Sequence, residues 1–135
     1  MEKQKKTTAI EQIGDLEADI MGVVWDKGKA TVQEARDALA PRRSLAYTTV
    51  MTVMSRLAEK GMLNRVKEGR AFVYTPAAPQ ERTAGSLLQS LVRRLYAGAT
   101  GKAIAQLLET EEEVDDAELE RLEQLIRSKR EGRRS

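Results

Sequence analysis

The chain has 135 residues, a formal net charge of +2, and neither cysteine nor histidine. This length suits one small domain, or one small domain with an oligomerisation arm. The missing cysteines exclude disulfides and thiolate metal sites, and the missing histidines remove the commonest general base and a common metal ligand. We therefore predict a protein that is not an enzyme and that uses no metal and no cofactor.

The small net charge conceals three charged segments. Residues 42–75 carry seven basic and two acidic side chains, residues 108–126 carry nine acidic side chains and one basic one, and residues 127–135 are net +4. A basic segment separated from an acidic one is typical of a surface directed at a polyanion, although solvated helix faces would give the same pattern. The sequence shows no long apolar run and no secretory signal, so we expect a cytoplasmic protein that does not insert into a membrane.

The first two elements in chain order are short helices. Apolar residues recur at helical spacing over residues 15–27, with Asp15 as the cap and Gly28 as the stop. Thr31 and Glu34 have the spacing of a capping box, which opens a second helix. Pro41 ends that helix, because the residue before a proline is disfavoured in the helical conformation.

A third helix is predicted from Ser44 to about Lys60, with a stop at Gly61. One face of it is apolar, whereas the opposite face carries small hydroxyl side chains where a helix selected only for solubility would carry Glu and Lys. These hydroxyl residues weaken helix propensity slightly, which indicates that something other than local stability favours them. We predict that this face and its flanks contact DNA through Thr48, Thr49, Met51, Thr52, Ser55 and Arg56.

A β-hairpin is predicted after the third helix, because the apolar period changes from 3.6 to 2. Its strands are residues 63–67 and 71–75, with Glu68 and Gly69 as the turn. Lys67 and Arg70 flank the turn and are candidates for phosphate contacts. Three helices followed by a basic hairpin is the element order of a winged helix-turn-helix, whose third helix reads the major groove while the hairpin, or wing, contacts the backbone.

The rest of the chain predicts helices with exposed leucine seams. A helix begins at residue 80, Gly98 and Gly101 mark a break, and a last helix begins at Asp115 or Asp116. These helices have little core of their own, so we expect them to pair with a second copy of the chain, although folding back onto the winged helix is an alternative. The predicted interface residues are Leu87, Leu88, Leu91, Val92, Leu95, Leu119, Leu122 and Ile126.

The expected fold class is mainly α with a small β-hairpin wing: an N-terminal winged helix-turn-helix followed by a C-terminal helical dimerisation arm. The expected parts are a flexible N-terminus (1–12), a DNA-binding domain (13–78), a dimerisation domain (79–127) and a flexible basic tail (128–135). That tail either touches DNA or the acidic segment, or is a solvated terminus.

Three strings in the sequence carry a family resemblance. They are GDLEADIMGVVWDKGKATVQEA at residues 14–35, LAYTTVMTVMSRLAEKGML at residues 45–63, and EGRAFVYTP at residues 68–76. Together they closely resemble the penicillinase-repressor family of the BlaI and MecI type, over nearly the whole chain. The resemblance implies a homodimeric, sequence-specific transcriptional repressor on a palindromic operator, with the third-helix residues and Arg70 at positions associated with DNA contact.

The resemblance also bears on induction. In the penicillinase type, a membrane sensor-protease cuts the C-terminal arm at an Asn-Phe bond, but the aligned dipeptide here is Gln106-Leu107. That particular cleavage signal does not carry over, although a related protease partner stays open. The copper-responsive branch uses a C-terminal cysteine cluster, which this chain lacks. The alternative function is a winged-helix module that contacts another protein and does not bind DNA.

Overall fold

The computed structural model describes residues 13–134, so the predicted flexible N-terminus lies outside the described residues. The chain divides into two units, Met1–Ser90 and Leu91–Ser135. The division falls inside one helix rather than at the predicted boundary after residue 78. In chain order the elements are α1 (Asp15–Lys27), α2 (Val32–Leu39), α3 (Tyr47–Glu59), β1 (Leu63–Glu68), β2 (Ala71–Pro76), α4 (Gln80–Leu95), α5 (Thr100–Thr110) and α6 (Asp116–Arg134).

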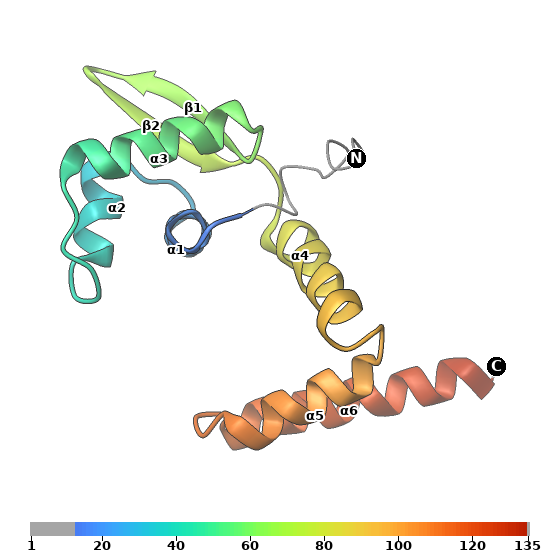
Figure 1. The fold of residues 1–135 in the computed structure, drawn as a ribbon. Coiled ribbons are helices and arrows are strands. Elements are labelled where there is room, and N and C mark those ends of the chain that lie inside the picture. Colours follow the sequence, from blue (N-terminus) through green and yellow to red (C-terminus); the bar gives the residue numbers. More distant parts are fainter. Residues whose placement is uncertain (1–12, 135) are drawn as a thin grey trace. The chain divides into compact units, whose positions relative to one another are not determined.

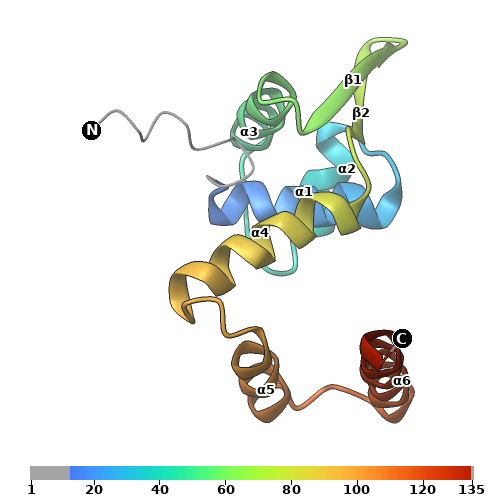
Figure 2. The same cartoon turned by 90° about the vertical axis from the view of Figure 1, so that its right-hand side faces the viewer.

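The first unit is built around one apolar core. Figures 1 and 2 show α3 beside the hairpin, with α1 and α2 packed against α3. Each helix turns its apolar stripe inward, as the periodicity predicts. The core residues from these helices are Ile20, Met21 and Val24 in α1, Val32, Ala35 and Leu39 in α2, and Val50, Val53, Met54 and Leu57 in α3. Together with the two-stranded hairpin, these helices confirm the predicted mainly α fold with a small β-hairpin wing.

The ends of the first two helices follow local chemistry. Gly28 follows α1 with φ = +86°, a conformation that a side chain disfavours. The predicted capping box of α2 is present, with the Glu34 amide donating to Thr31 Oγ1 at 3.1 Å and the Thr31 amide donating to Glu34 Oε1 at 2.9 Å. The cap of α1 is Gly14 rather than Asp15, because Glu17 Oε1 accepts from the Gly14 amide at 3.1 Å.

Two predicted positions in the next elements were wrong. Helix α3 begins at Tyr47 rather than Ser44, because the preceding segment is extended and the Leu45 carbonyl accepts a 2.7 Å hydrogen bond from Arg36 Nε. The hairpin turn is Gly69 and Arg70 rather than Glu68 and Gly69, because Glu68 still pairs with Ala71. Gly69 supplies the left-handed conformation at φ = +66°, so the turn places Arg70 at the tip of the wing.

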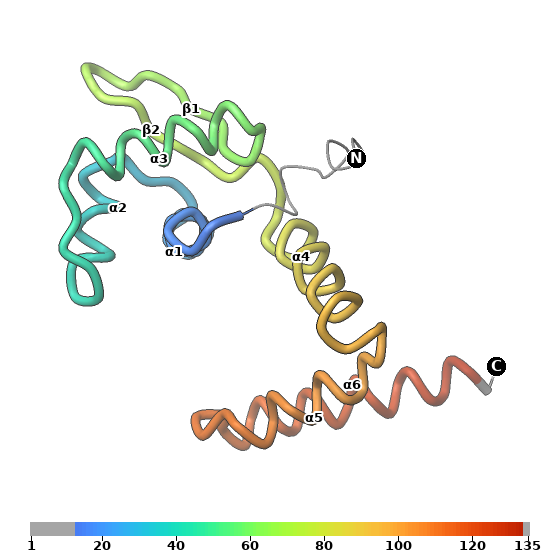
Figure 3. Tube along the Cα trace, in the orientation of Figure 1, coloured from blue at the N-terminus to red at the C-terminus, as the bar shows by residue number. Residues whose placement is uncertain are grey.

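The base of the hairpin is fixed to the helices. β1 and β2 form a two-stranded antiparallel sheet, and the Cα trace in Figure 3 shows the hairpin extending beyond the helices. Ala30, in the loop between α1 and α2, adds a bridge to Tyr74 through two backbone hydrogen bonds of 2.9 Å. Tyr74 is buried, and Trp25 Nε1 donates to the Ala78 carbonyl at 3.0 Å just beyond β2.

The second unit consists of the C-terminal end of α4 together with the whole of α5 and α6. Gly98 has a positive φ and lies in the break between α4 and α5, as predicted. Gly101 was also predicted to mark this break, but it lies within α5. Asp115 caps α6, accepting from the Glu118 amide at 2.9 Å. The predicted flexible tail instead continues α6 as helix as far as Arg134. Within the described residues, no helix is long and apolar enough to cross a membrane.

Candidate nucleic-acid interface

The outward face of α3 carries the predicted contact residues. Thr48, Thr49, Thr52 and Arg56 are exposed, and Ser55 is half-buried at the edge beside β1. Met51 is 40% exposed, although its neighbours Val50 and Val53 belong to the core. A helix whose inner face is fixed by packing presents hydroxyl groups that both donate and accept hydrogen bonds, together with threonine methyl groups. These groups match the edges of bases in the major groove, including the thymine methyl.

The wing carries basic side chains around one aromatic ring. Lys67 pairs with Phe72 across the hairpin, and Arg70 lies in the turn. The Lys67 ammonium is 6.0 Å from the centre of the Phe72 ring, and the Arg65 guanidinium is 4.6 Å from it. Phe72 is 42% exposed, so the ring supports both cations at the surface rather than filling the core.

Arg65 is a candidate contact residue that the sequence reasoning missed. Besides its contact with Phe72, its Nη1 makes a long hydrogen bond of 3.5 Å to Ser55 Oγ, so it links β1 to α3. The sequence contained a signal for this contact: side chains alternate between the two faces of a strand, so Arg65 and Lys67 lie on the same face. The correct turn, which pairs Lys67 with Phe72, was needed to place an aromatic ring under both.

The seven basic residues of segment 42–75 fall into two groups. One group is neutralised by α1: Arg43 Nε lies 3.0 Å from Asp19 Oδ2, with Arg42 at 3.9 Å, and Lys60 Nζ lies 2.9 Å from Glu17. The other group has no carboxylate within 4.0 Å among the described residues, and consists of Arg56, Arg65, Lys67 and Arg70. Within this segment, the cations without an ion pair therefore lie at the end of α3 and along the wing, beside the hydroxyl-rich face.

Comparison with known proteins matches residues 13–128 to the family described as Penicillinase repressor. The chain belongs to the penicillinase repressor family. The transcriptional regulator BlaI of Mycobacterium tuberculosis is 36% identical over 100 residues, which are 73% of this chain and 72% of that one. The penicillinase repressor of Bacillus licheniformis is 31% identical over 117 residues, which are 87% and 91% of the two chains.

The solved structures agree on the fold. A MarR mutant from E. coli complexed with operator DNA is similar with a TM-score of 0.51 over 93% of this chain and 86% of that one. Because the sequence identity is only 16%, this similarity shows a shared fold and nothing about function. The predicted family is confirmed, and with it the prediction that this chain is a transcriptional repressor and not an enzyme.

This member of the penicillinase repressor family uses an ion pair to hold α1 against the end of α3. Burial of the Glu17 carboxylate, acting alone, would raise its pKa. The hydrogen bonds from Lys60 Nζ and the Gly14 amide, with the charges of Lys60 and Arg56, outweigh burial and hold the pKa below its usual 4.5. A carboxyl whose pKa is lower in the folded chain stabilises the fold above its unfolded pKa, and loses that stabilisation as the pH falls through the folded pKa.

Replacing Glu17 by glutamine is therefore expected to lower the free energy of unfolding by about 1 kcal/mol at pH 7, given the partial exposure of the pair. The difference in the free energy of unfolding between this variant and the wild type should stay constant above about pH 5. It should shrink below the usual carboxyl pKa, because the wild-type carboxylate becomes protonated. Urea unfolding between pH 3 and 7 measures this. Glu59→Gln, at an exposed site in the last turn of α3, is the control and should show neither effect. A Glu17→Gln deficit that grows as the pH falls would contradict the assignment.

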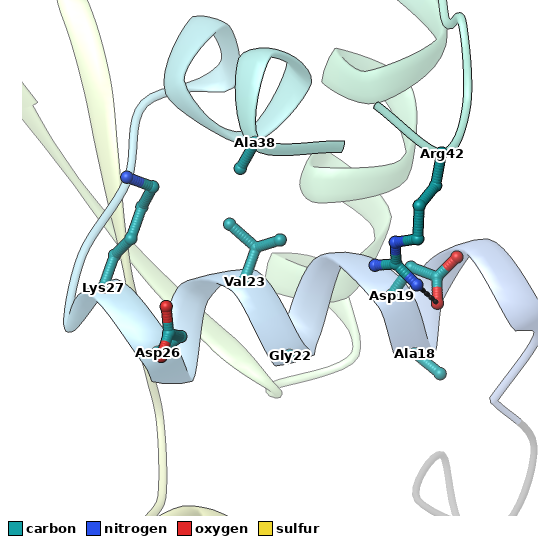
Figure 4. Close-up of a pocket in the computed structure, with 8 residues that line it drawn as sticks. All are labelled: Ala18, Asp19, Gly22, Val23, Asp26, Lys27, Ala38 and Arg42. Atoms are coloured by element: carbon teal, nitrogen blue, oxygen red, sulfur yellow. Dashed lines mark ion pairs between the residues drawn. The ribbon is translucent and has the colours of Figure 1, made fainter. Parts of the chain in front are cut away.

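This chain also has a shallow hollow between α1 and α2, with a volume of about 340 Å³. Figure 4 shows Gly22 and Val23 along its middle, with the pair Asp19 and Arg42 at one end and Lys27 at the other. Its charged groups lie at the rim and partly neutralise one another. Within residues 13–134, no group of three His, Cys, Asp or Glu side chains is arranged to hold a metal ion.

The predicted dimer residues of the repressor lie along apolar faces of α4 and α6. Three of them are half-buried, namely Leu87, Val92 and Leu122. The other five are exposed: Leu88, Leu91, Leu95, Leu119 and Ile126. The sequence reasoning missed further exposed apolar residues on α5 and α6, namely Ile104, Leu107, Leu108 and Leu125. Such a series of exposed leucines is unusual for a monomeric surface.

Proposed function

We propose that this protein is a homodimeric repressor that binds a palindromic operator sequence-specifically. Helix α3 enters the major groove, where Thr48, Thr49, Met51, Thr52 and Ser55 meet base edges. Arg56, Lys67 and Arg70, together with Arg65, contact phosphates beside it. The observation that carries this proposal is the hydroxyl-rich face of α3 bordered by cations that have no described carboxylate within 4.0 Å. The proposed location is the cytoplasm, where a bacterial operator lies.

The exposed leucines of α4 to α6 support the proposed dimer. These helices pack little against other elements of the described chain, and their apolar faces suit a second, identical copy. A dimer with two-fold symmetry presents two α3 helices to two half-sites, so the operator is a palindrome with half-sites spaced by whole turns of DNA.

Induction is proposed to follow proteolysis of the C-terminal arm, with a membrane sensor-protease as partner. The bond between Gln106 and Leu107 lies within α5, where the Gln106 carbonyl accepts a 2.9 Å hydrogen bond from Thr110 Oγ1. Cleavage there requires local opening of the helix, because proteases act on the transiently opened chain.

The test of DNA binding is titration of the gene's own upstream DNA at several salt concentrations. Wild-type affinity should fall steeply with salt, because binding neutralises phosphates and releases counterions. Arg56→Ala or Arg70→Ala should weaken binding to all sequences and reduce the salt slope by about 1. Thr52→Val should alter base preference, with an effect of about 1–3 kcal/mol.

Arg43→Ala is the matched control, because it removes one positive charge that Asp19 already neutralises at 3.0 Å. It should leave the salt slope nearly unchanged. Absence of any protected site at every salt concentration, together with capture of a specific protein partner, would instead support the interaction-module alternative.

A further inference from the structure

Helix α6 carries opposite charges on its two halves. Residues 116–123 hold four acidic side chains and one basic one, whereas residues 127–134 hold five basic side chains and one acidic one. The helix dipole favours acids at the start and bases at the end, but this effect falls off within one turn. Glu120, Glu123 and Arg127 lie beyond the terminal turns, so the dipole does not account for the separation.

An apolar seam crosses the boundary between these halves. Leu119, Leu122 and Ile126 follow one another at steps of three and four residues, which places them on one face of the helix. Leu119 is 39% exposed and Ile126 is 54% exposed. Within the second unit, α6 does not pack extensively against α5 or the end of α4. Figure 2 shows α6 lying apart from α5.

We propose that α6 pairs antiparallel with α6 of a second copy, so that the acidic half of each helix lies against the basic half of the other. This inference rests on the proposed homodimer and specifies the direction of its α6 contact. With Leu122 of one copy near Ile126 of the other, Asp116 comes close to the level of Arg130 of the second copy, and two-fold symmetry repeats the pair. The basic segment 127–134 is then part of the dimer interface rather than a DNA-binding tail.

The charges distinguish this direction from a parallel one. A parallel pair would set acid against acid at one end and base against base at the other. Asp116 and Arg130 are 14 residues apart along the helix, or about 21 Å at 1.5 Å per residue. Ionic screening acts over about 8 Å at physiological salt, so the attraction between opposite ends could not offset the repulsion at both ends of a parallel pair. Only the antiparallel direction brings opposite charges together.

Disulfide trapping tests the direction, because the chain has no cysteine and each introduced thiol is the only one. Leu125→Cys, near the middle of the pair, should form a disulfide-linked dimer under mild oxidation. Glu118→Cys and Gly132→Cys should not link to themselves, since a disulfide requires Cα atoms within about 7 Å. A mixture of these two variants, after subunit exchange, should link to each other. A Cβ at Gly132 meets nothing within 4 Å, so this variant keeps the helix intact.

Charge exchange provides the second measurement. Asp116→Arg should weaken dimerisation in sedimentation, and adding Arg130→Asp should restore most of it, because both pairs are then reversed. Efficient self-linking of Glu118→Cys and Gly132→Cys, or no linking at any position, would overturn the antiparallel contact while leaving a wild-type dimer in place. So would a loss of DNA affinity in Arg130→Asp without any change in dimerisation. A monomeric wild type would overturn the proposed homodimer itself.

Discussion

Aspartate at both Leu91 and Leu95 is expected to convert the proposed dimer into a monomer at micromolar concentration. Leu91 is 50% exposed and Leu95 is 72% exposed within a single chain, so the charges cost the isolated chain little. Buried in the proposed interface, two unpaired carboxylates would be strongly unfavourable. Operator affinity should fall on the order of 100-fold, because the second half-site is no longer bound by a linked copy. Sedimentation velocity and a gel-shift titration measure the two effects.

Gln89→Asp is the control for this variant, since it adds a carboxylate to an exposed polar position of the same helix. It should leave both the dimer and the operator affinity unchanged. A double leucine variant that still sediments as a dimer would exclude this part of α4 from the interface. A variant that becomes a monomer but keeps wild-type operator affinity would show that one half-site is sufficient for binding.

Truncation of Leu57 to alanine is expected to lower the free energy of unfolding by about 2–5 kcal/mol. Leu57 is fully buried on the inner face of α3, and its loss would leave a cavity beneath the proposed reading helix. Small domains have only about 5–15 kcal/mol of stability, so the variant should be close to unfolding at 37 °C. Chemical denaturation of the full chain measures the change.

Met51→Ala is the matched comparison, because Met51 lies on the flank of the exposed face of the same helix and is 40% exposed. Its stability should stay within about 0.5 kcal/mol of the wild type, while its operator affinity falls. The two variants thus separate the packing role of α3 from its binding role. Equal destabilisation by both would mean that the outer face is not free for DNA.

The helices and the buried face of α3 were predictable because they depend on local signals. The apolar stripes, the capping box at Thr31 and the stop at Gly28 all act within a few residues, so the sequence alone indicates them. The exposed face of α3 followed directly, since the side opposite a buried stripe faces outward. The structure confirms that Thr48 and Thr52 are exposed on this face, and that Arg56 is exposed on its flank.

The errors and omissions lie where distant residues meet. The start of α3 depends on Arg36, nine residues before Leu45, which holds the preceding segment extended. The contact of Arg65 with Phe72 depends on the hairpin register, and a shift of one residue in the turn changes which side chains are paired. The neutralisation of Arg43 by Asp19 joins two elements that no sequence period relates.

The bridge between Ala30 and Tyr74 anchors the wing to the helices at its base, and its tip projects from this attachment. Tyr74 is 1% exposed and joined to the α1–α2 loop by two hydrogen bonds, whereas the residues around Gly69 are exposed. The base therefore sets the direction in which the wing points before DNA arrives, and little entropy is lost in aiming it. In the proposed DNA complex, any adjustment of the wing to operators of different curvature would therefore be confined to its exposed tip.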